Sequence, residues 1–129
     1  MKGRYIPTQS SIIVTREMTQ EEILAQGWTS AQMCYDTRKL LHYFRLMPNG
    51  RMLFGMRGAM RHTAQSETEN RAKVRADFDA FFPAWRHVET PYYWSGFVCL
   101  TRDFLPYAGP IPEMDGGFAA FDYHGNGVS

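Results

Sequence analysis

The most regular hydrophobic pattern in the chain lies between residues 66 and 85. Apolar side chains recur there at spacings of 4, 3, 1 and 3 residues, which places them on one face of an α-helix. These side chains are Val74, Phe78, Phe81, Phe82 and Trp85. The capping-box pattern Ser66-Glu67-Thr68-Glu69 predicts where this long helix begins. Pro83 predicts its end, because proline disfavours helical backbone in the residue before it.

A second, shorter helix is predicted after residue 19. Thr19-Gln20-Glu21-Glu22 has the spacing of a capping box, and Gly27 suits the position just after a helix that ends near Gln26. The polar segment 1–10 is expected to form an arm or lead-in. The β-branched run 11–15 predicts a short, buried strand.

A β-hairpin is the clearest strand signal. Two apolar runs, residues 42–47 and 51–55, flank Pro48-Asn49-Gly50. Proline pre-sets a turn angle and Asn-Gly supplies positive φ, so this tripeptide predicts the turn. The remaining elements are predicted as a short strand within 28–38, a long strand from Pro91 to Leu100, a loop over 102–117, and a last strand from Gly117 to Tyr123.

This order of elements predicts the fold class. Strands separated by only a few residues favour antiparallel pairing, so we expect an α+β fold. It would hold a mixed, mainly antiparallel sheet with two helices, one short and one long. A length of 129 residues suits a single domain over 1–129. The last strand leads into the glycine-rich turn His124-Gly125-Asn126-Gly127, a pattern that normally continues into a further element, often a helix whose N-terminus faces a ligand. We therefore expect the chain to be a fragment of a longer protein.

Composition excludes several classes of protein. The 14 Lys+Arg and 13 Asp+Glu give a net charge of +1, which argues against a nucleic-acid-binding module. No apolar run approaches the roughly 20 residues of a membrane helix, and residues 1–5 lack the apolar core of a signal peptide. Cys34 and Cys99 form a poor disulfide framework and no zinc site. A cytoplasmic location is expected.

Aromatic residues make up 15% of the chain, and eight methionines accompany them. Such side chains fill a core, or they line a pocket or a surface that another domain covers. Core filling is the favoured interpretation.

Candidate chemistry is sparse. The sequence has no nucleophile motif, no phosphate-binding loop and no clustered metal ligands, so it identifies no catalytic or metal-binding residue. Of the scattered histidines, His42, His62 and His87 are expected to play surface or core roles. His124 differs, because it lies between a strand end and glycines, where loops commonly carry function. Arg45 interrupts an apolar strand, so it faces either solvent or a pocket.

A longer pattern occupies the second half of the chain. It reads Trp94-x-Gly96, then Thr101-x-Asp103-x-x-Pro106-x-x-Gly109-Pro110, then His124-Gly125-x-Gly127. Together with Tyr43-Phe44-Arg45 and Leu53-Phe54-Gly55, it resembles the FAD-dependent oxidoreductases of the D-amino-acid oxidase type, in the branch like γ-glutamylputrescine oxidoreductases. The resemblance extends from about Asp36 to Ser129.

The resemblance implies a role within a larger flavoenzyme. Such enzymes combine a dinucleotide-binding domain with a substrate domain, and the sequence lacks the Gly-x-Gly-x-x-Gly of the former. The chain is therefore similar to the substrate domain, with about 104–129 as the start of the returning FAD-binding segment. The implied cofactor is FAD, bound by the full-length protein and not by this fragment. The implied partners are the missing dinucleotide-binding domain and a small amine or amino-acid substrate, and the implied reaction oxidises a carbon–nitrogen bond.

The resemblance also implies site residues. The substrate-binding candidates are Tyr43, Arg45, Arg57 and Trp94. The cofactor-binding candidates are Gly109, His124, Gly125, Asn126 and Gly127.

The sequence departs from the family pattern in two places. Amino-acid oxidases of this type commonly carry Trp-x-Gly-x-Arg-Pro, whose arginine clamps the substrate carboxylate. Val98 and Cys99 occupy these positions here, which favours an amine or polyamine derivative over an α-amino acid. Met56 stands where relatives often have a glycine, and packing is its expected role.

Other interpretations remain open at this stage. The chain could come from a D-amino-acid or glycine-type oxidase or dehydrogenase. It could be a standalone binding module, or a small enzyme that uses His124 as an acid or base. A fragment would expose the apolar face on which its missing domain docks, so self-association is also expected.

Overall fold

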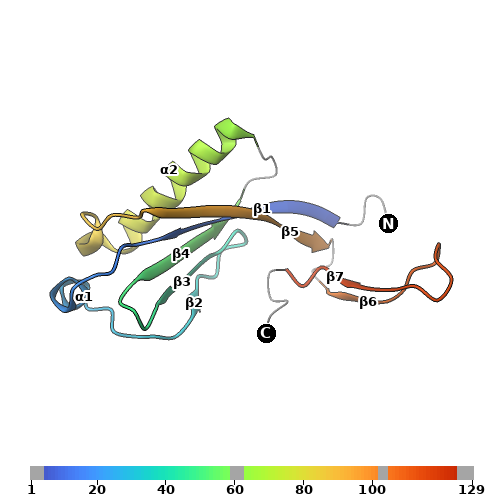
Figure 1. Cartoon of the computed structure of the whole chain (residues 1–129), viewed down its shortest axis with the longest axis horizontal. Coiled ribbons are helices and arrows are strands. Elements are labelled where there is room, and N and C mark those ends of the chain that lie inside the picture. Colours follow the sequence, from blue (N-terminus) through green and yellow to red (C-terminus); the bar gives the residue numbers. More distant parts are fainter. Residues whose placement is uncertain (1–4, 59–62, 102–104, 125–129) are drawn as a thin grey trace.

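A five-stranded antiparallel sheet, a long helix on one of its faces and a separate two-stranded hairpin make up the computed structural model (Figure 1), which describes residues 5–58, 63–101 and 105–124. The strands of the large sheet lie in the order β2-β3-β4-β1-β5, and β6 pairs with β7. The elements are β1 (Tyr5–Val14), α1 (Gln20–Gln26), β2 (Cys34–Tyr35), β3 (His42–Leu46), β4 (Met52–Arg57), α2 (Ala64–Phe81), a 3₁₀ turn (Pro83–Trp85), β5 (Tyr92–Thr101), β6 (Tyr107–Pro110) and β7 (Phe118–Phe121). The predicted α+β class with one short and one long helix is confirmed, and every pairing among the described strands is antiparallel.

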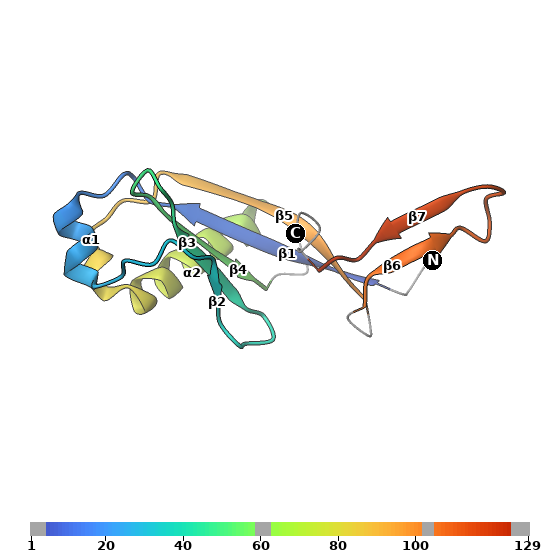
Figure 2. The same cartoon turned by 90° about the horizontal axis from the view of Figure 1, so that it is seen from below.

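The sheet and the hairpin extend along the long axis of the molecule. Seen from below, the β6–β7 hairpin projects beyond the ends of β1 and β5 (Figure 2). None of the described helices is long and apolar enough to cross a membrane.

The short helix begins and ends where the sequence predicts. Thr19 caps α1, its hydroxyl accepts from the backbone of Glu22 at 3.2 Å, and the Glu22 carboxylate accepts from the backbone of Thr19 at 2.9 Å. Gly27 follows the helix with φ 71°, the left-handed conformation that glycine adopts without strain.

The long helix begins earlier than predicted. Thr63, not Ser66, is its N-cap, and the Thr63 hydroxyl accepts from the backbone of Ser66 at 3.1 Å. The prediction was wrong because two hydroxyl residues lie three positions apart, and Ser66 takes the third-residue role in the box of Thr63. The end at Phe81, just before Phe82 and Pro83, agrees with the predicted end.

Two strand predictions need correction. Residues 5–10 are not an arm, because β1 starts at Tyr5 and pairs along its whole length with β5, from Tyr5 opposite Thr101 to Val14 opposite Tyr92. The predicted loop 102–117 contains β6, which pairs with β7. The pairing of β1 with β5 joins segments far apart in the chain, which a local pattern of polar residues does not reveal.

The predicted hairpin is present. β3 and β4 pair with Phe44 opposite Phe54, and the connecting turn includes Gly50 at φ 72°. The predicted short strand within 28–38 and the long strand near 91–100 are also present, as β2 and β5.

The core lies between the large sheet and α2. Alternate residues of β3 and β4 point toward the helix, and the predicted apolar stripe of α2 meets them. The buried cluster comprises Ile13, Met18, Phe44, Leu46, Met52, Phe54, Met56, Val74, Phe78, Phe82, Trp85 and Val88. Met56 belongs to this cluster, so its predicted packing role is confirmed. The indole N–H of Trp85 donates to the Glu22 carbonyl at 2.7 Å, which satisfies its one polar atom.

A buried histidine connects the sheet to the helix. His42 is 3% exposed, and its ring nitrogens lie 2.7 Å from Asp36 and 3.1 Å from Asp77. Lys73 donates to Asp77 at 2.7 Å, so the cluster contains a positive charge as well as carboxylates. Of the surface or core role that the sequence predicts for His42, the structure shows the core role.

Candidate functional site

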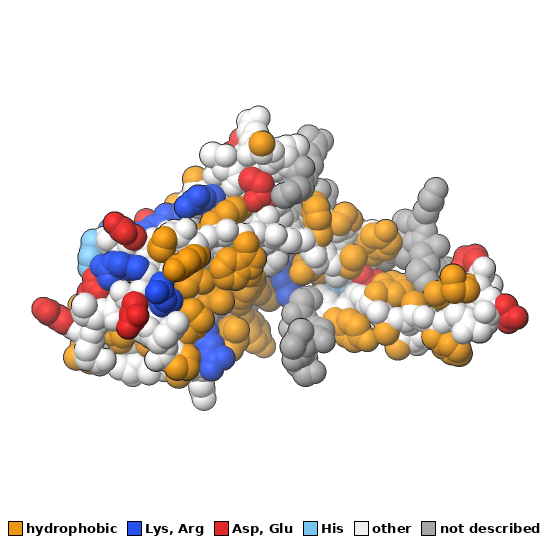
Figure 3. Space-filling model, in the orientation of Figure 1, with side chains coloured by type: hydrophobic (Ala, Val, Ile, Leu, Met, Phe, Trp, Pro, Cys, Tyr) orange, Lys and Arg blue, Asp and Glu red, His pale blue; other side chains and the backbone are white. Residues whose placement is uncertain are grey.

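The face of the sheet opposite α2 carries an open groove of about 620 Å³. Its lining comes from β1, β2, β3, β4, β5 and the segments beside β2 and β3. The lining residues are Ser10, Ile12, Met33, Tyr35, Leu41, Tyr43, Arg57, Trp94, Ser95, Gly96, Phe97 and Val98. We call this feature the open-face groove. Figure 3 shows hydrophobic side chains gathered over the middle of the sheet and along the hairpin.

Strand alternation explains how these side chains reach the groove. His42 and Phe44 of β3 point into the core, so Tyr43 between them points to the opposite face. On β5, Trp94 lies opposite Ile12 of β1, and both line the groove. The outward residues of a half-buried sheet thus form the site.

The Tyr43 ring lies across Gly55, its partner on β4. A Cβ atom added to Gly55 would lie 2.2 Å from the Tyr43 Cζ, so only glycine leaves room for the ring. The hydroxyls of Tyr43 and Ser10 are hydrogen-bonded at 2.7 Å. Burial raises the pKa of Tyr43, and this outweighs the lowering by Ser10 and by the charge of Arg57. Tyr43 is thus a fixed, neutral hydroxyl at the groove.

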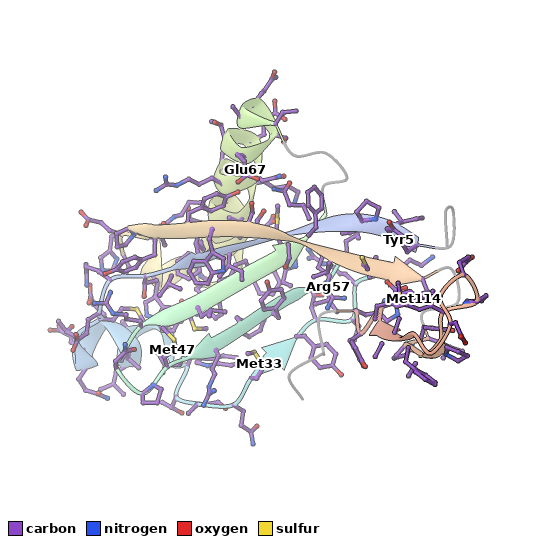
Figure 4. All side chains as sticks on the ribbon, turned by 45° about the vertical axis from the view of Figure 1, so that its right-hand side comes forward. Tyr5, Met33, Met47, Arg57, Glu67 and Met114 are labelled. Carbon is purple, nitrogen blue, oxygen red and sulfur yellow. The ribbon has the colours of Figure 1, made fainter. Side chains whose placement is uncertain are left out.

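Arg57 ends β4 and links the groove to the segment after β7. Its guanidinium donates to the backbone carbonyl of His124. The ring Nε2 of His124 lies 3.2 Å from the Thr101 hydroxyl, at the end of β5. In Figure 4, Arg57 lies at the end of the sheet nearest the hairpin that carries Met114, away from Glu67 on α2. The structure therefore places one predicted substrate residue directly against one predicted cofactor residue.

The four substrate-binding candidates do not all meet. Tyr43, Arg57 and Trp94 line the open-face groove. Arg45 is not part of its lining, and its Nε donates to the Ala31 carbonyl at 3.0 Å. Trp94 is 47% exposed, so much of its indole is available for contact.

The cofactor-binding candidates are placed in part. Gly109 lies in β6, where a Cβ atom would come within 3.0 Å of the Tyr107 hydroxyl, so its missing side chain makes room for a ring of its own hairpin. His124 lies beside Arg57 as described above. Gly125, Asn126 and Gly127 lie outside the described residues.

Asp122 is a polar residue that the motifs did not single out. It is 4% exposed, it has φ 64°, and neither carboxylate oxygen has a hydrogen-bond partner in the described part of the chain. Burial raises the pKa of the nearby Cys99, and the negative charge of Asp122 adds to this effect. No local pattern in the sequence predicts that Asp122 is buried, because an aspartate after a strand is typical of a turn.

Sequence reasoning also missed part of the groove wall. Ser10, Ile12, Met33, Tyr35 and Leu41 line it without belonging to a motif. Of these residues, only Ser10 and Ile12 could be grouped from the sequence, because their alternate positions predict that they share one face of a strand. That pattern does not indicate what the face binds. Among residues 5–58, 63–101 and 105–124, no three His, Cys, Asp or Glu side chains are grouped to hold a metal ion.

Comparison with known proteins adds the family. The model of the family "FAD dependent oxidoreductase" matches residues 2–129. "Probable oxidoreductase OrdL" of Haemophilus influenzae is 29% identical over 130 residues, which cover 98% of this chain and 27% of that protein. "Gamma-glutamylputrescine oxidoreductase" of Escherichia coli is 27% identical over 131 residues, which cover 98% of this chain and 28% of that protein. The chain thus spans about a quarter of the length of these relatives.

Solved structures support the same fold. L-proline dehydrogenase from P. horikoshii superposes with a TM-score of 0.72 at 19% identity, over 98% of this chain and 33% of that one. Glycine oxidase from Geobacillus kaustophilus superposes with a TM-score of 0.59 at 19% identity, over 91% of this chain and 29% of that one. Because the family model covers nearly the whole chain and the fold agrees, this chain belongs to the FAD-dependent oxidoreductase family.

Proposed function

We propose that this chain is the substrate-binding part of a longer flavoenzyme that oxidises the carbon–nitrogen bond of an amine or polyamine derivative, and that it is inactive by itself. The open-face groove carries this proposal, because it is a concave site lined by aromatic and aliphatic side chains with a few polar groups. Tyr43, Arg57 and Trp94 are the proposed substrate contacts. Arg45 would act only if its bond to Ala31 is exchanged for one to substrate.

The charge of the groove narrows the substrate class. Arg57 is the only charged side chain among the described residues that line it. An unmodified polyamine carries several ammonium groups, and a site with a cation and no carboxylate repels them. An amine that also carries a carboxylate or amide carbonyl offers an acceptor to Arg57, and its apolar part packs on Trp94. The name of the relative from Escherichia coli, which acts on γ-glutamylputrescine, agrees with such a derivative.

We propose that this chain holds one part of FAD in the longer protein. The buried carboxylate of Asp122 has no partner in the described residues, and the N–H and O–H groups of a flavin and its ribityl chain are suitable donors. His124 and Gly109 are the proposed neighbours of the cofactor, with Gly125, Asn126 and Gly127. The sequence contains no Gly-x-Gly-x-x-Gly, so we assign the pyrophosphate to the dinucleotide-binding domain of the longer protein. When bound, the flavin supplies the hydride acceptor.

The proposed docking partner of this chain is that domain. Large hydrophobic side chains are exposed both beside the groove and on the hairpin, with Tyr35 at 71% and Phe118 at 76%. Exposed apolar surface of this kind is typical of a face that another domain covers.

An α-amino acid is the second candidate substrate. Val98 lines the groove where the family pattern has an arginine, which argues against a carboxylate clamp from β5. Arg57 brings a guanidinium to the same groove from β4, and this observation favours retaining the second candidate. An arginine from another strand can bind a carboxylate with the same chemistry.

The test is a visible absorption spectrum of the full-length protein, recorded before and after anaerobic addition of substrates. We expect a flavin spectrum that an N-acylated or carboxylated diamine bleaches and that free diamines and α-amino acids leave unchanged. Bleaching by α-amino acids would select the second candidate. A folded full-length protein without flavin would overturn both. The isolated chain should show no flavin absorbance and no turnover.

A further inference from the structure

The N-terminal half of α2 meets the sheet through polar side chains. Gln9 of β1 is 1% exposed, and its Nε2 donates to the Glu67 carboxylate and to the Ser95 hydroxyl, the latter at 2.9 Å. The Oε1 atom of Gln9 accepts from Asn70 at 2.8 Å. Glu67 also accepts from Ser95 at 2.7 Å and from the Tyr93 hydroxyl at 2.8 Å. We call these five residues the polar cluster.

The polar cluster holds β5 on both sides of Trp94. Side chains alternate along a strand, so Tyr93 and Ser95 face α2 while Trp94 between them faces the open-face groove. Both neighbours of Trp94 donate to one carboxylate, that of Glu67. β5 pairs with β1 alone among the described strands, so no second strand of this part of the chain fixes β5 from its other edge.

The hydrophobic pattern of β5 leaves its register open. One face of the strand carries Tyr92, Trp94, Gly96, Val98 and Leu100, and the other carries Tyr93, Ser95, Phe97, Cys99 and Thr101. Both faces contain large apolar side chains, so a shift of one residue against β1 exchanges the faces without a clear loss of apolar burial. Hydrophobic burial alone therefore does not determine which face of β5 lines the groove.

The polar cluster distinguishes the observed register from its neighbours. A shift of one residue puts Gly96 or Trp94 where Ser95 now lies. Neither side chain can accept from Gln9 and also donate to Glu67. Because Gln9 is buried, water does not replace the lost partner, and a buried polar group without its partner is costly. The polar cluster therefore favours the register in which Trp94 lines the groove.

We propose that Gln9 and Glu67 are positioning residues that fix the register of β5 and thereby determine which of its side chains face the open-face groove. The consequence for substrate rests on the proposed function, which makes Trp94 a substrate contact, whereas the register can be tested without a substrate. Setting a register is the best attested role of buried polar groups in proteins. The same register keeps Val98 in the groove, and the proposed substrate class depends on that position.

Hydrogen–deuterium exchange of the full-length protein, followed by mass spectrometry, measures how firmly β5 is held. Glu67→Leu removes the bonds that the carboxylate accepts from Gln9, Tyr93 and Ser95. Each such bond shifts the ratio of closed to open forms by roughly two- to twelvefold. We therefore expect peptides of β5 to exchange at least about tenfold faster in this variant, while peptides of β3 keep the wild-type rate.

Further variants assign the effect to the carboxylate. Glu67→Gln keeps the length of the side chain and one oxygen acceptor, so it should restore most of the slow exchange. Glu69→Leu is the matched control, because Glu69 lies two residues along the same helix and accepts from Gln65 at an exposed site. This control should exchange like the wild type. Gln9→Met replaces Glu67→Leu if that variant does not fold, and it should likewise accelerate exchange in β5 and not in β3.

Kinetics connect the register to the groove. Only the observed register presents Trp94 to a substrate such as N-acetylputrescine, an N-acylated diamine. Glu67→Leu should therefore raise the KM for this amine and leave kcat unchanged, because the substrate binds only the fraction of the protein that has this register.

The contrary results are distinguishable. Unchanged exchange of β5 in the folded variants, or equal acceleration of β3 and β5, would overturn the register role of Gln9 and Glu67. A lower kcat at unchanged KM would overturn the link to the groove. A folded full-length protein without flavin would overturn the proposed function, and the exchange rates alone would then decide whether the polar cluster fixes the register.

Discussion

The glycine beneath the Tyr43 ring offers a sharp test of how the open-face groove is built. In Gly55→Ala the only change is one methyl group on β4. Gly55 does not have positive φ, so alanine fits its backbone. The added Cβ would lie 2.2 Å from Cζ and 2.6 Å from the hydroxyl of Tyr43. A loss of stability must therefore come from contact with this ring, because alanine at a compatible position otherwise stabilises a protein by restricting its unfolded chain.

The size of the effect follows from the geometry. Carbon atoms in contact lie at least about 3.5 Å apart, so the ring must move by roughly 1.3 Å. Such a shift takes the Tyr43 hydroxyl out of reach of Ser10, to which it is now bonded at 2.7 Å. Overpacking costs about 1–3 kcal/mol and a lost hydrogen bond about 0.5–1.5 kcal/mol. We expect Gly55→Ala to lower the free energy of unfolding by about 1.5–4.5 kcal/mol.

Urea unfolding followed by circular dichroism measures this change. Gly96→Ala is the matched control, because a Cβ atom there meets nothing within 4 Å although Gly96 lines the same groove. Tyr43→Phe, which loses only the hydroxyl, should cost no more than the hydrogen-bond share of the total. A free energy of unfolding for Gly55→Ala within about 0.5 kcal/mol of the wild type would refute the reasoning.

Three further predictions concern other parts of the structure. His42→Gln should lower the free energy of unfolding by about 1–3 kcal/mol near neutral pH, because the hydrogen bonds of His42 to two carboxylates are disturbed. Burial tends to raise the pKa of both Asp36 and Asp77, but hydrogen bonds from His42 and other neighbours leave each pKa lowered. The stabilisation that the two carboxylates provide is therefore present above the unfolded carboxyl pKa of about 3.9, and it is lost as pH falls through their lower pKa values in the folded protein. His42→Gln should therefore lose less stability on acidification than the wild type, when urea unfolding near neutral pH is compared with urea unfolding below the unfolded carboxyl pKa. Thr63→Ala should cost about 1 kcal/mol by removing the true cap of α2, and an unchanged urea midpoint would contradict that assignment. In the full-length protein, Val98→Arg should raise kcat/KM for α-amino acids relative to amines by about tenfold or more, since a charge-assisted hydrogen bond contributes about 1.5–3 kcal/mol; an unchanged ratio in steady-state kinetics would contradict the substrate argument.

The elements that the sequence predicted correctly depend on neighbours close in the chain. The capping box at Thr19 and the turn at Gly50 are set by the conformations of a few residues, and both are present. The apolar stripe of α2 identifies its buried face because helix periodicity is local, and Val74 and Phe78 are buried on it. The family pattern from Trp94 onward is likewise a feature of the sequence, and the family model matches.

The composition of the site depended on the tertiary structure. Arg45 and Arg57 both lie on outward positions of the β3–β4 hairpin, and the sequence pattern alone does not distinguish which of them lines the groove. In the observed register Tyr43 lies opposite Gly55, so Arg45 is two residues nearer the turn, and its bond to Ala31 holds it away from the groove. Arg57 lies toward the other end, where the chain returns after β7 and His124 meets it.

Contacts between distant segments of the chain determined the features that the sequence did not predict. The sequence of residues 5–10 predicted a polar arm, yet they form six of the ten residues of β1, because β5 supplies hydrogen bonds that no local pattern contains. The isolation of Asp122 could not be predicted either, since burial without a partner depends on every segment packed around a side chain. The sequence by itself determined the helices, the hairpin and the family. The packing of distant segments decided which of the candidate residues form one site.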